Sequence, residues 1–122
     1  MKEKDFAIIF RHWIKANPQI SGSYEIKDTR GKNYINYSEI PEHQINYAQA
    51  INSKTGVLIR VQGMGGEPDY IYLRNAPAYF VIKYPKSFEI IAVENLLFER
   101  DRNKKIKSLT YLRAKAISTI SI

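Results

Sequence analysis

The period of the apolar residues changes repeatedly along this chain of 122 residues, and the alternation restricts the fold more than any other feature. Between residues 4 and 16, Phe6, Phe10 and Trp13 recur at helical spacing on one face, and an Asn-Pro pair ends the pattern. Residues 23–29 then alternate as a strand does. Helices and strands that alternate along a chain pack as layers on a sheet, so we expect an α/β protein.

The alternation continues through the middle of the chain. A basic turn separates the first strand from a short strand at 34–37, and the two strands together suggest a hairpin. Pro41 precedes a helical stripe at 42–51, and Gln44 lies on the stripe that faces the core. A continuous apolar run at 55–61 is typical of a strand covered on both faces.

The last half of the chain indicates strands first and helices after them. Strands at 70–73 and 78–84 could pair as a second hairpin. A short strand and a helix from about Val93 should follow. We expect Ser108 to cap a last helix that packs partly through Leu112.

One mixed β-sheet flanked by helices is the expected architecture, in a single domain that spans residues 1–122. Hydrophobic residues at 44% and charged residues at 25% have the balance of a folded soluble protein. No apolar run is long enough for a membrane span, and the N-terminus leads into a helix unlike a signal peptide. We therefore expect no membrane partner and a cytoplasmic location, in a bacterium or a phage-infected host. Cysteine is absent, so any metal should bind oxygen or imidazole. His12 and His43 are too few and too separate to suggest a histidine metal centre.

The charge is strongly positive and unevenly spread. The net charge is +7 with a pI near 9.6, and residues 81–122 hold nine Lys or Arg against four acids. Such an excess favours polyanions, and nucleic acid is the first partner to consider, although many basic proteins bind no polyanion specifically. The candidate DNA-binding residues occupy the turn after the first strand and a charged connection near the C-terminus: Arg30, Lys32, Arg100, Arg102, Lys104 and Lys105.

An acid and a base stand two positions apart in the first strand. Side chains alternate across a strand, so Glu25 and Lys27 project to the same face. A carboxylate can ligate Mg²⁺, and a nearby ammonium can stabilise charge that develops on a phosphate. Taken alone, such a pair is more often an ordinary ion pair on an exposed strand.

The wider context of this pair resembles a known family. The residues YEIKDTRGKNYINYSEIPEHQINY, at 24–47, resemble the PD-(D/E)XK nuclease superfamily, and within it the recombination protein U type of Holliday junction resolvase and its small phage relatives. A weaker likeness continues through GVLIRV and DYIYL. The resemblance implies a restriction-endonuclease-like fold and a DNA endonuclease dependent on Mg²⁺ or Mn²⁺. It implies Glu25 as metal ligand, Lys27 as catalytic ammonium, and Gln44 facing the active site.

The chain departs from the family at one metal ligand. The superfamily normally carries an Asp on the strand before Glu-x-Lys, and no acid lies between Asn17 and Glu25. Asp69, after a glycine-rich loop, is the first candidate to replace it, and Glu3 on the first helix is the second. Asp28 is closer in the chain, but it points to the face opposite Glu25.

The chain holds nine tyrosines, which could stack on nucleobases. Most of them fall at strand positions, where aromatic side chains ordinarily pack, so we expect packing rather than stacking.

Three classes of function follow. The first is a metal-dependent endonuclease of branched DNA or Holliday junctions, for which substrate symmetry would favour a homodimer. The second is a catalytically inactive protein of the same fold that binds DNA, since one acid is missing. The third is a basic interaction protein of a phage or its host.

Overall fold

A mixed β-sheet forms the centre of the protein. The structure is a computed structural model that describes residues 2–17, 22–62, 64–66 and 68–121. The sheet has four strands in the order β1-β5-β6-β8, with β1 parallel to β5 and the other neighbours antiparallel. These strands are β1 (Ser23–Asp28), β5 (Ala78–Lys83), β6 (Phe88–Ala92) and β8 (Ile120–Ser121). The expectation of an α/β protein with a mixed sheet and flanking helices is confirmed.

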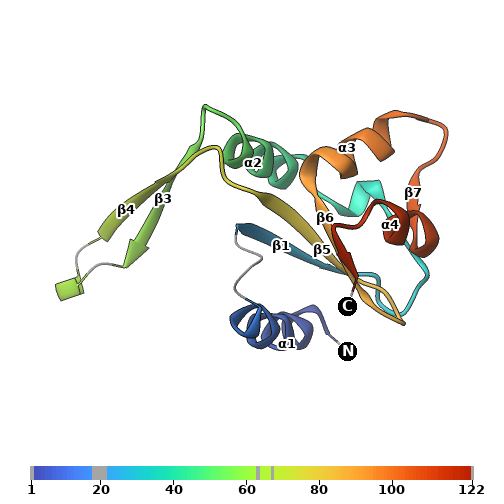
Figure 1. Cartoon of the computed structure of the whole chain (residues 1–122), viewed down its shortest axis with the longest axis horizontal. Coiled ribbons are helices and arrows are strands. Elements are labelled where there is room, and N and C mark those ends of the chain that lie inside the picture. The colour runs from blue at the N-terminus through green and yellow to red at the C-terminus, as the bar shows by residue number, and fades with distance from the viewer. Residues whose placement is uncertain (1, 18–21, 63, 67, 122) are drawn as a thin grey trace.

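Helices cover both faces of this sheet. α1 lies on one side, and α2 and α3 lie on the other (Figure 1). The helices are α1 (Glu3–Ala16), α2 (Glu42–Asn52), α3 (Val93–Asp101) and α4 (Tyr111–Ile117). The helices expected at 4–16, at 42–51 and from Val93 are therefore confirmed. None of the helices that the structure describes is long and apolar enough to cross a membrane.

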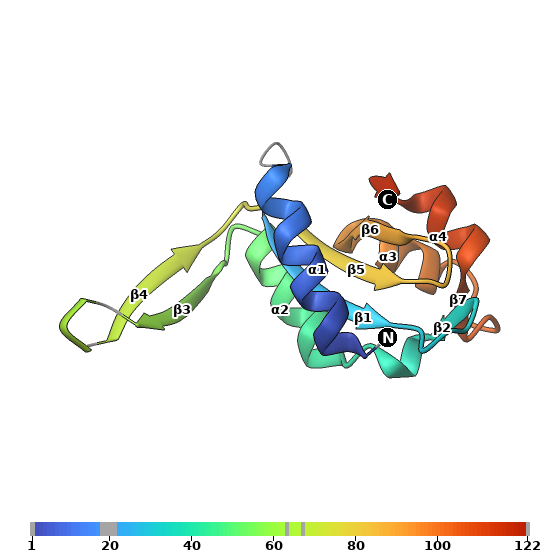
Figure 2. The ribbon, with the colours of Figure 1, turned by 90° about the horizontal axis from the view of Figure 1, so that it is seen from below.

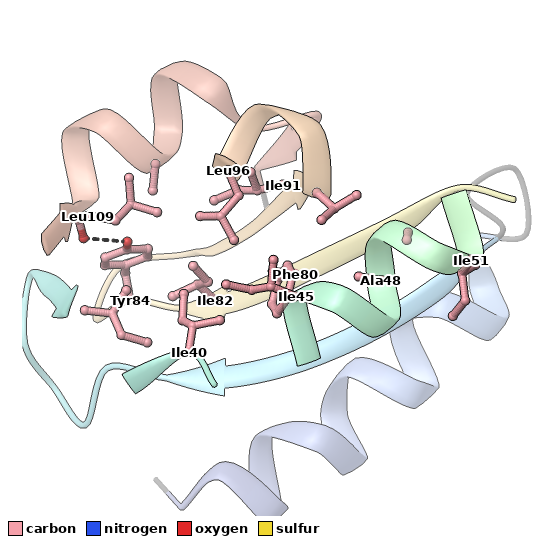
Figure 3. Close-up of a cluster of buried hydrophobic side chains, with 14 residues drawn as sticks. Ile40, Ile45, Ala48, Ile51, Phe80, Ile82, Tyr84, Ile91, Leu96 and Leu109 are labelled. Atoms are coloured by element: carbon pink, nitrogen blue, oxygen red, sulfur yellow. Dashed lines mark hydrogen bonds between the residues drawn. The ribbon is translucent and has the colours of Figure 1, made fainter. Parts of the chain in front are cut away.

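Each face of the sheet has its own apolar cluster. Under α1, the buried rings of Phe6 and Phe10 pack with Val81 and Ile90. On the other face, a larger cluster joins α2, α3 and α4 to the sheet (Figure 3). The labelled members of that cluster are Ile40, Ile45, Ala48, Ile51, Phe80, Ile82, Tyr84, Ile91, Leu96 and Leu109.

The hairpin expected from the first two strands is wrong. β1 pairs directly with β5, and the part of the chain that connects the two strands contains α2. β2 (Tyr34–Asn36) pairs with β7 (Ser108–Thr110) and forms a separate two-stranded sheet. Pairing with β5 places Tyr24 and Ile26 of β1 in the apolar cluster under α1, a non-local gain that the local turn signal does not contain.

The second expected hairpin and the covered strand are also wrong. Among the strands that the structure describes, β3 (Val57–Gln62) pairs only with β4 (Pro68–Leu73), and this hairpin projects away from the central sheet (Figures 1 and 2). Residues Leu58 and Ile71 are exposed rather than enclosed between helices. β4 does not pair with β5, because β1 and β6 already occupy the two edges of β5.

The base of the hairpin is fixed against the end of α2. The Gly56 amide donates to the Ala50 carbonyl at 2.9 Å, and the Asn75 amide donates to the Ser53 carbonyl at 2.9 Å. Gly56 has a φ of +70°, and a Cβ there would lie 2.6 Å from the Leu73 carbonyl oxygen. Glycine is thus required where the chain leaves the helix.

The last helix begins later than expected. Ser108 lies in β7, and the Thr110 hydroxyl caps α4 by accepting a hydrogen bond from the Arg113 amide. Leu112, expected to pack in the core, is 75% exposed, whereas Ala114 is buried. Ala114 of α4 and Leu109 of β7 belong to the same apolar cluster.

Candidate active site on strand β1

Strand β1 presents Glu25 and Lys27 on the face covered by α2. Their pairing partners on β5 are Phe80 and Ile82, which belong to the apolar cluster under α2. Paired residues of neighbouring strands point to the same face of a sheet. Lys27 Nζ lies 3.9 Å from Glu25 Oε1, and the side chains of Lys27 and Glu25 are 13% and 42% exposed. The expected juxtaposition is confirmed, with the ammonium largely enclosed and the carboxylate open to solvent.

Gln44 adds an unpaired polar atom on the same side of the sheet. It lies in the first turn of α2, a helix that contacts both β1 and β5. Its Oε1 is buried and has no hydrogen-bond partner among the described residues. A buried acceptor without a partner costs about 1–3 kcal/mol, so this oxygen is an unsatisfied polar atom next to the strand that carries Glu25 and Lys27.

A buried acid on this face was missed by the sequence analysis. Glu89 on β6 pairs with Ile82, so it points to the same face as Lys27, with Ile82 between them. The side chain is fully buried, and neither carboxylate oxygen has a partner within the described part of the chain. An acid at an inward position of the apolar run FEIIA was the available signal.

The two candidates for the missing acid lie elsewhere. Asp69 pairs with Val61 in the projecting hairpin, away from β1 (Figure 1). Glu3 accepts a hydrogen bond from the Asp28 amide at 3.3 Å, and Glu3 and Asp28 line a pocket of about 400 Å³ with Lys2 and Arg30. Glu3 therefore lies near the end of β1, whereas Asp69 lies on the projecting hairpin and not beside Glu25.

The site offers few side chains that could bind Mg²⁺. Within the described residues there is no group of three or more His, Cys, Asp or Glu that could hold a metal ion. β1 is an edge of the sheet, so no described strand beyond it supplies a second acid. Mg²⁺ prefers oxygen ligands and is often held by one or two carboxylates together with substrate phosphates. Glu25 supplies one carboxylate that is open to solvent, and Gln44 adds a buried side-chain oxygen on the same side of the sheet.

The basic residues expected to contact DNA fall into two groups. Arg30 and Lys32 are exposed in the turn after β1, where Lys32 Nζ lies 5.6 Å from the centroid of the Tyr34 ring. Lys104 and Lys105 are exposed after α3. The two arginines of the connection are engaged instead: Arg100 pairs with Glu42 and Asp101, and Arg102 pairs with Glu99.

Glu99 is the centre of an ion-pair cluster that the sequence analysis did not find. Its buried carboxylate accepts hydrogen bonds from Arg102 at 3.0 and 3.1 Å and from Arg113 at 2.8 and 2.9 Å. Hydrogen bonds from Arg113, and then from Arg102, outweigh burial and lower the pKa of Glu99 to about 2. The i, i+3 spacing of Glu99 and Arg102 was a local signal, whereas Arg113 comes from another helix.

Fold and site together define an α/β protein whose edge strand β1 carries an acid–base pair, with exposed basic residues in the turn after β1 and in the segment after α3. Comparison with protein-family models, with curated proteins and with solved structures found no match for this chain.

Proposed function

We propose that this protein is a metal-dependent endonuclease that hydrolyses phosphodiester bonds of branched DNA, with a restriction-endonuclease-like fold. The observation that carries the proposal is the 3.9 Å contact between Glu25 and Lys27 on the face to which α2 brings Gln44. The resemblance of residues 24–47 to the PD-(D/E)XK nucleases supports the same assignment.

The residues have complementary roles in this proposal. Glu25 and the Gln44 carbonyl oxygen would hold Mg²⁺ or Mn²⁺ together with a substrate phosphate. The bound cation would supply positive charge next to the scissile phosphate. Lys27 stabilises the negative charge that develops as water attacks phosphorus, where one P–O bond forms while the bond to the leaving sugar oxygen breaks.

The exposed basic residues support a DNA substrate. The net charge of +7 favours binding through release of counterions from DNA, and the exposed Lys104, Lys105, Arg30 and Lys32 are available for phosphate contacts. Among branched substrates, a Holliday junction is two-fold symmetric, and this symmetry would favour a homodimer of the protein.

A second candidate is a catalytically inactive nuclease-fold protein that binds DNA. It is favoured by the absence of a group of three metal-binding side chains within the described residues. In that case the Lys27–Glu25 pair would be structural, and the exposed basic residues alone would be functional.

Cleavage of a labelled four-way junction tests the proposal. Purified protein is incubated with the junction or with a linear duplex of the same arm sequence, in Mg²⁺, in Mn²⁺ or in EDTA. We expect cation-dependent nicking of the junction in preference to the duplex. Salt-dependent binding without cleavage in either cation would favour the inactive DNA-binding protein, and failure to bind DNA would leave a basic interaction protein.

A further inference from the structure

One face of the projecting hairpin exposes two tyrosine rings. In the β3–β4 pairing, Tyr70 lies opposite Arg60, and Tyr72 lies opposite Leu58. Because side chains alternate along strands, these four project to one face. Tyr70, Tyr72 and Leu58 are 58%, 54% and 63% exposed, so the rings do not pack as strand aromatics ordinarily do. We call these four residues the tyrosine face.

The tyrosine face is held in a fixed relation to the body of the protein. The Ala76 amide donates to the Ile51 carbonyl at 3.0 Å, and the Asn52 side-chain amide donates to the Ala76 carbonyl at 3.1 Å. Val57 and Leu73 pack against the large apolar cluster at the base of the hairpin. The Tyr72 hydroxyl donates to the Thr55 carbonyl, which restrains the ring. An ordered ring loses little conformational entropy when a ligand stacks on it.

The positive charge on and near the tyrosine face favours a negatively charged partner. Arg60 is the charged member of the tyrosine face, and the exposed Lys54 and Arg74 flank the base of the hairpin. Asp69 alternates to the other face with Ile71. Two such faces from separate copies would bring Arg60 side chains together, and the chain already carries a net charge of +7. A polyanion with flat apolar surfaces matches both the charge and the rings.

We propose that the tyrosine face binds unpaired DNA, with nucleobases stacked on Tyr70 and Tyr72 and a phosphate held by Arg60. Successive outward positions of a strand are about 7 Å apart, so the two rings are separate platforms. Every base has a π-face, so the binding is tolerant of sequence, and Arg60 adds a salt-dependent contact. The inference deepens the proposed function, on which it rests for the DNA partner, by naming single-stranded regions as what the hairpin recognises.

Binding to single-stranded and duplex DNA of equal length tests the inference. The probes are a fluorescein-labelled oligo(dT) and a blunt duplex, titrated by anisotropy at two salt concentrations. We expect Tyr70→Ala and Tyr72→Ala each to weaken oligo(dT) binding by about fivefold or more and to leave duplex binding within twofold. Tyr70→Phe should bind as the unmodified protein does, because the ring is retained. Ile71→Ser is the matched control, since it alters an exposed side chain on the other face of the same strand.

The outcomes separate this inference from the proposed function. Unchanged oligo(dT) affinity in both alanine variants, or an equal loss in Ile71→Ser, overturns the inference while duplex binding still supports a DNA-binding protein. A dimer seen by sedimentation that Tyr70→Ala disrupts, with oligo(dT) affinity unchanged, would assign the face to a second copy and also overturn the inference. If the unmodified protein binds neither probe, both proposals fail.

Discussion

Arg113 Nε donates to Glu99 Oε1 at 2.8 Å, while its Nη2 donates to Glu99 Oε2 at 2.9 Å, so one guanidinium grips both oxygens of a buried carboxylate. The contact joins α4 to α3 at a distance of 14 residues along the chain. Arg102 completes the cluster from the end of α3. The Arg113–Glu99 pair fixes the position of α4, a short helix in which Ala114 is the buried residue.

The stability of the protein should fall in acid because of Glu99. Its pKa is lowered from 4.5 to about 2 in the folded state, chiefly by the hydrogen bonds from Arg113. The stabilisation is therefore present above about pH 4.5 and is lost as the pH falls towards 2. We expect Glu99→Gln to lower the free energy of unfolding at pH 7 by about 1–3 kcal/mol, with the difference shrinking in that acid range. Urea unfolding at several pH values measures both, with Glu94→Gln on the same helix as control. A constant difference across the range would contradict the assignment.

Glu25 should be required for cleavage and not for folding. Glu25→Gln removes the open carboxylate but keeps the shape of the side chain, so we expect loss of cation-dependent junction cleavage by about 100-fold or more. Junction affinity in EDTA and the melting temperature should stay close to those of the unmodified protein. Gln44→Leu is the companion change, and it should lower cleavage without lowering stability, since the Gln44 Oε1 is unpaired. Cleavage by purified Glu25→Gln at the normal rate would remove Glu25 from the site.

Asp69 should be dispensable for cleavage, because it lies on the hairpin and not beside Glu25. We expect Asp69→Asn to cleave junctions at a rate within about threefold of the unmodified protein. The measurement is a single-turnover cleavage rate in Mg²⁺, with Glu25→Gln in parallel. Equal losses in the two variants, with no further loss in the double variant, would show that the two acids serve one metal and that the hairpin closes onto β1.

The two lysines after α3 should contribute to DNA binding without affecting stability. Lys104 and Lys105 are exposed, whereas neighbouring Arg102 is engaged with Glu99. Replacing both lysines by alanine should weaken duplex binding and reduce the slope of log affinity against log salt by about one for each phosphate that the variant no longer binds. Lys15→Ala in the last turn of α1 is the control for a general change of charge. An unaltered slope in the double variant would make this segment a solvated connection.

The spacing of apolar residues along the sequence determined most helices and strands. It also determined which face of its strand or helix each site residue occupies. The stripe around Phe6 and Phe10 predicted α1, and alternation alone placed Glu25 and Lys27 on one face of β1. Both predictions rest on local geometry, since the period of a helix or strand fixes which side chains share a face. Even Gln44 followed from its place on the helical stripe that carries Ala48 and Ile51.

Pairing between distant segments was decided by the tertiary structure. The pattern of apolar residues in a strand does not show which other strand it pairs with. We therefore expected β1 to pair with β2, whereas in the structure β1 pairs with β5 and β2 pairs with β7. The same reason explains why Arg113 could not be assigned to Glu99 and why Asp69 was expected near Glu25. Local alternation along β4 is enough to place Tyr70 and Tyr72 on one face. Their exposure depends on the tertiary structure, because β1 and β6 occupy both edges of β5 and leave the β3–β4 hairpin outside the central sheet.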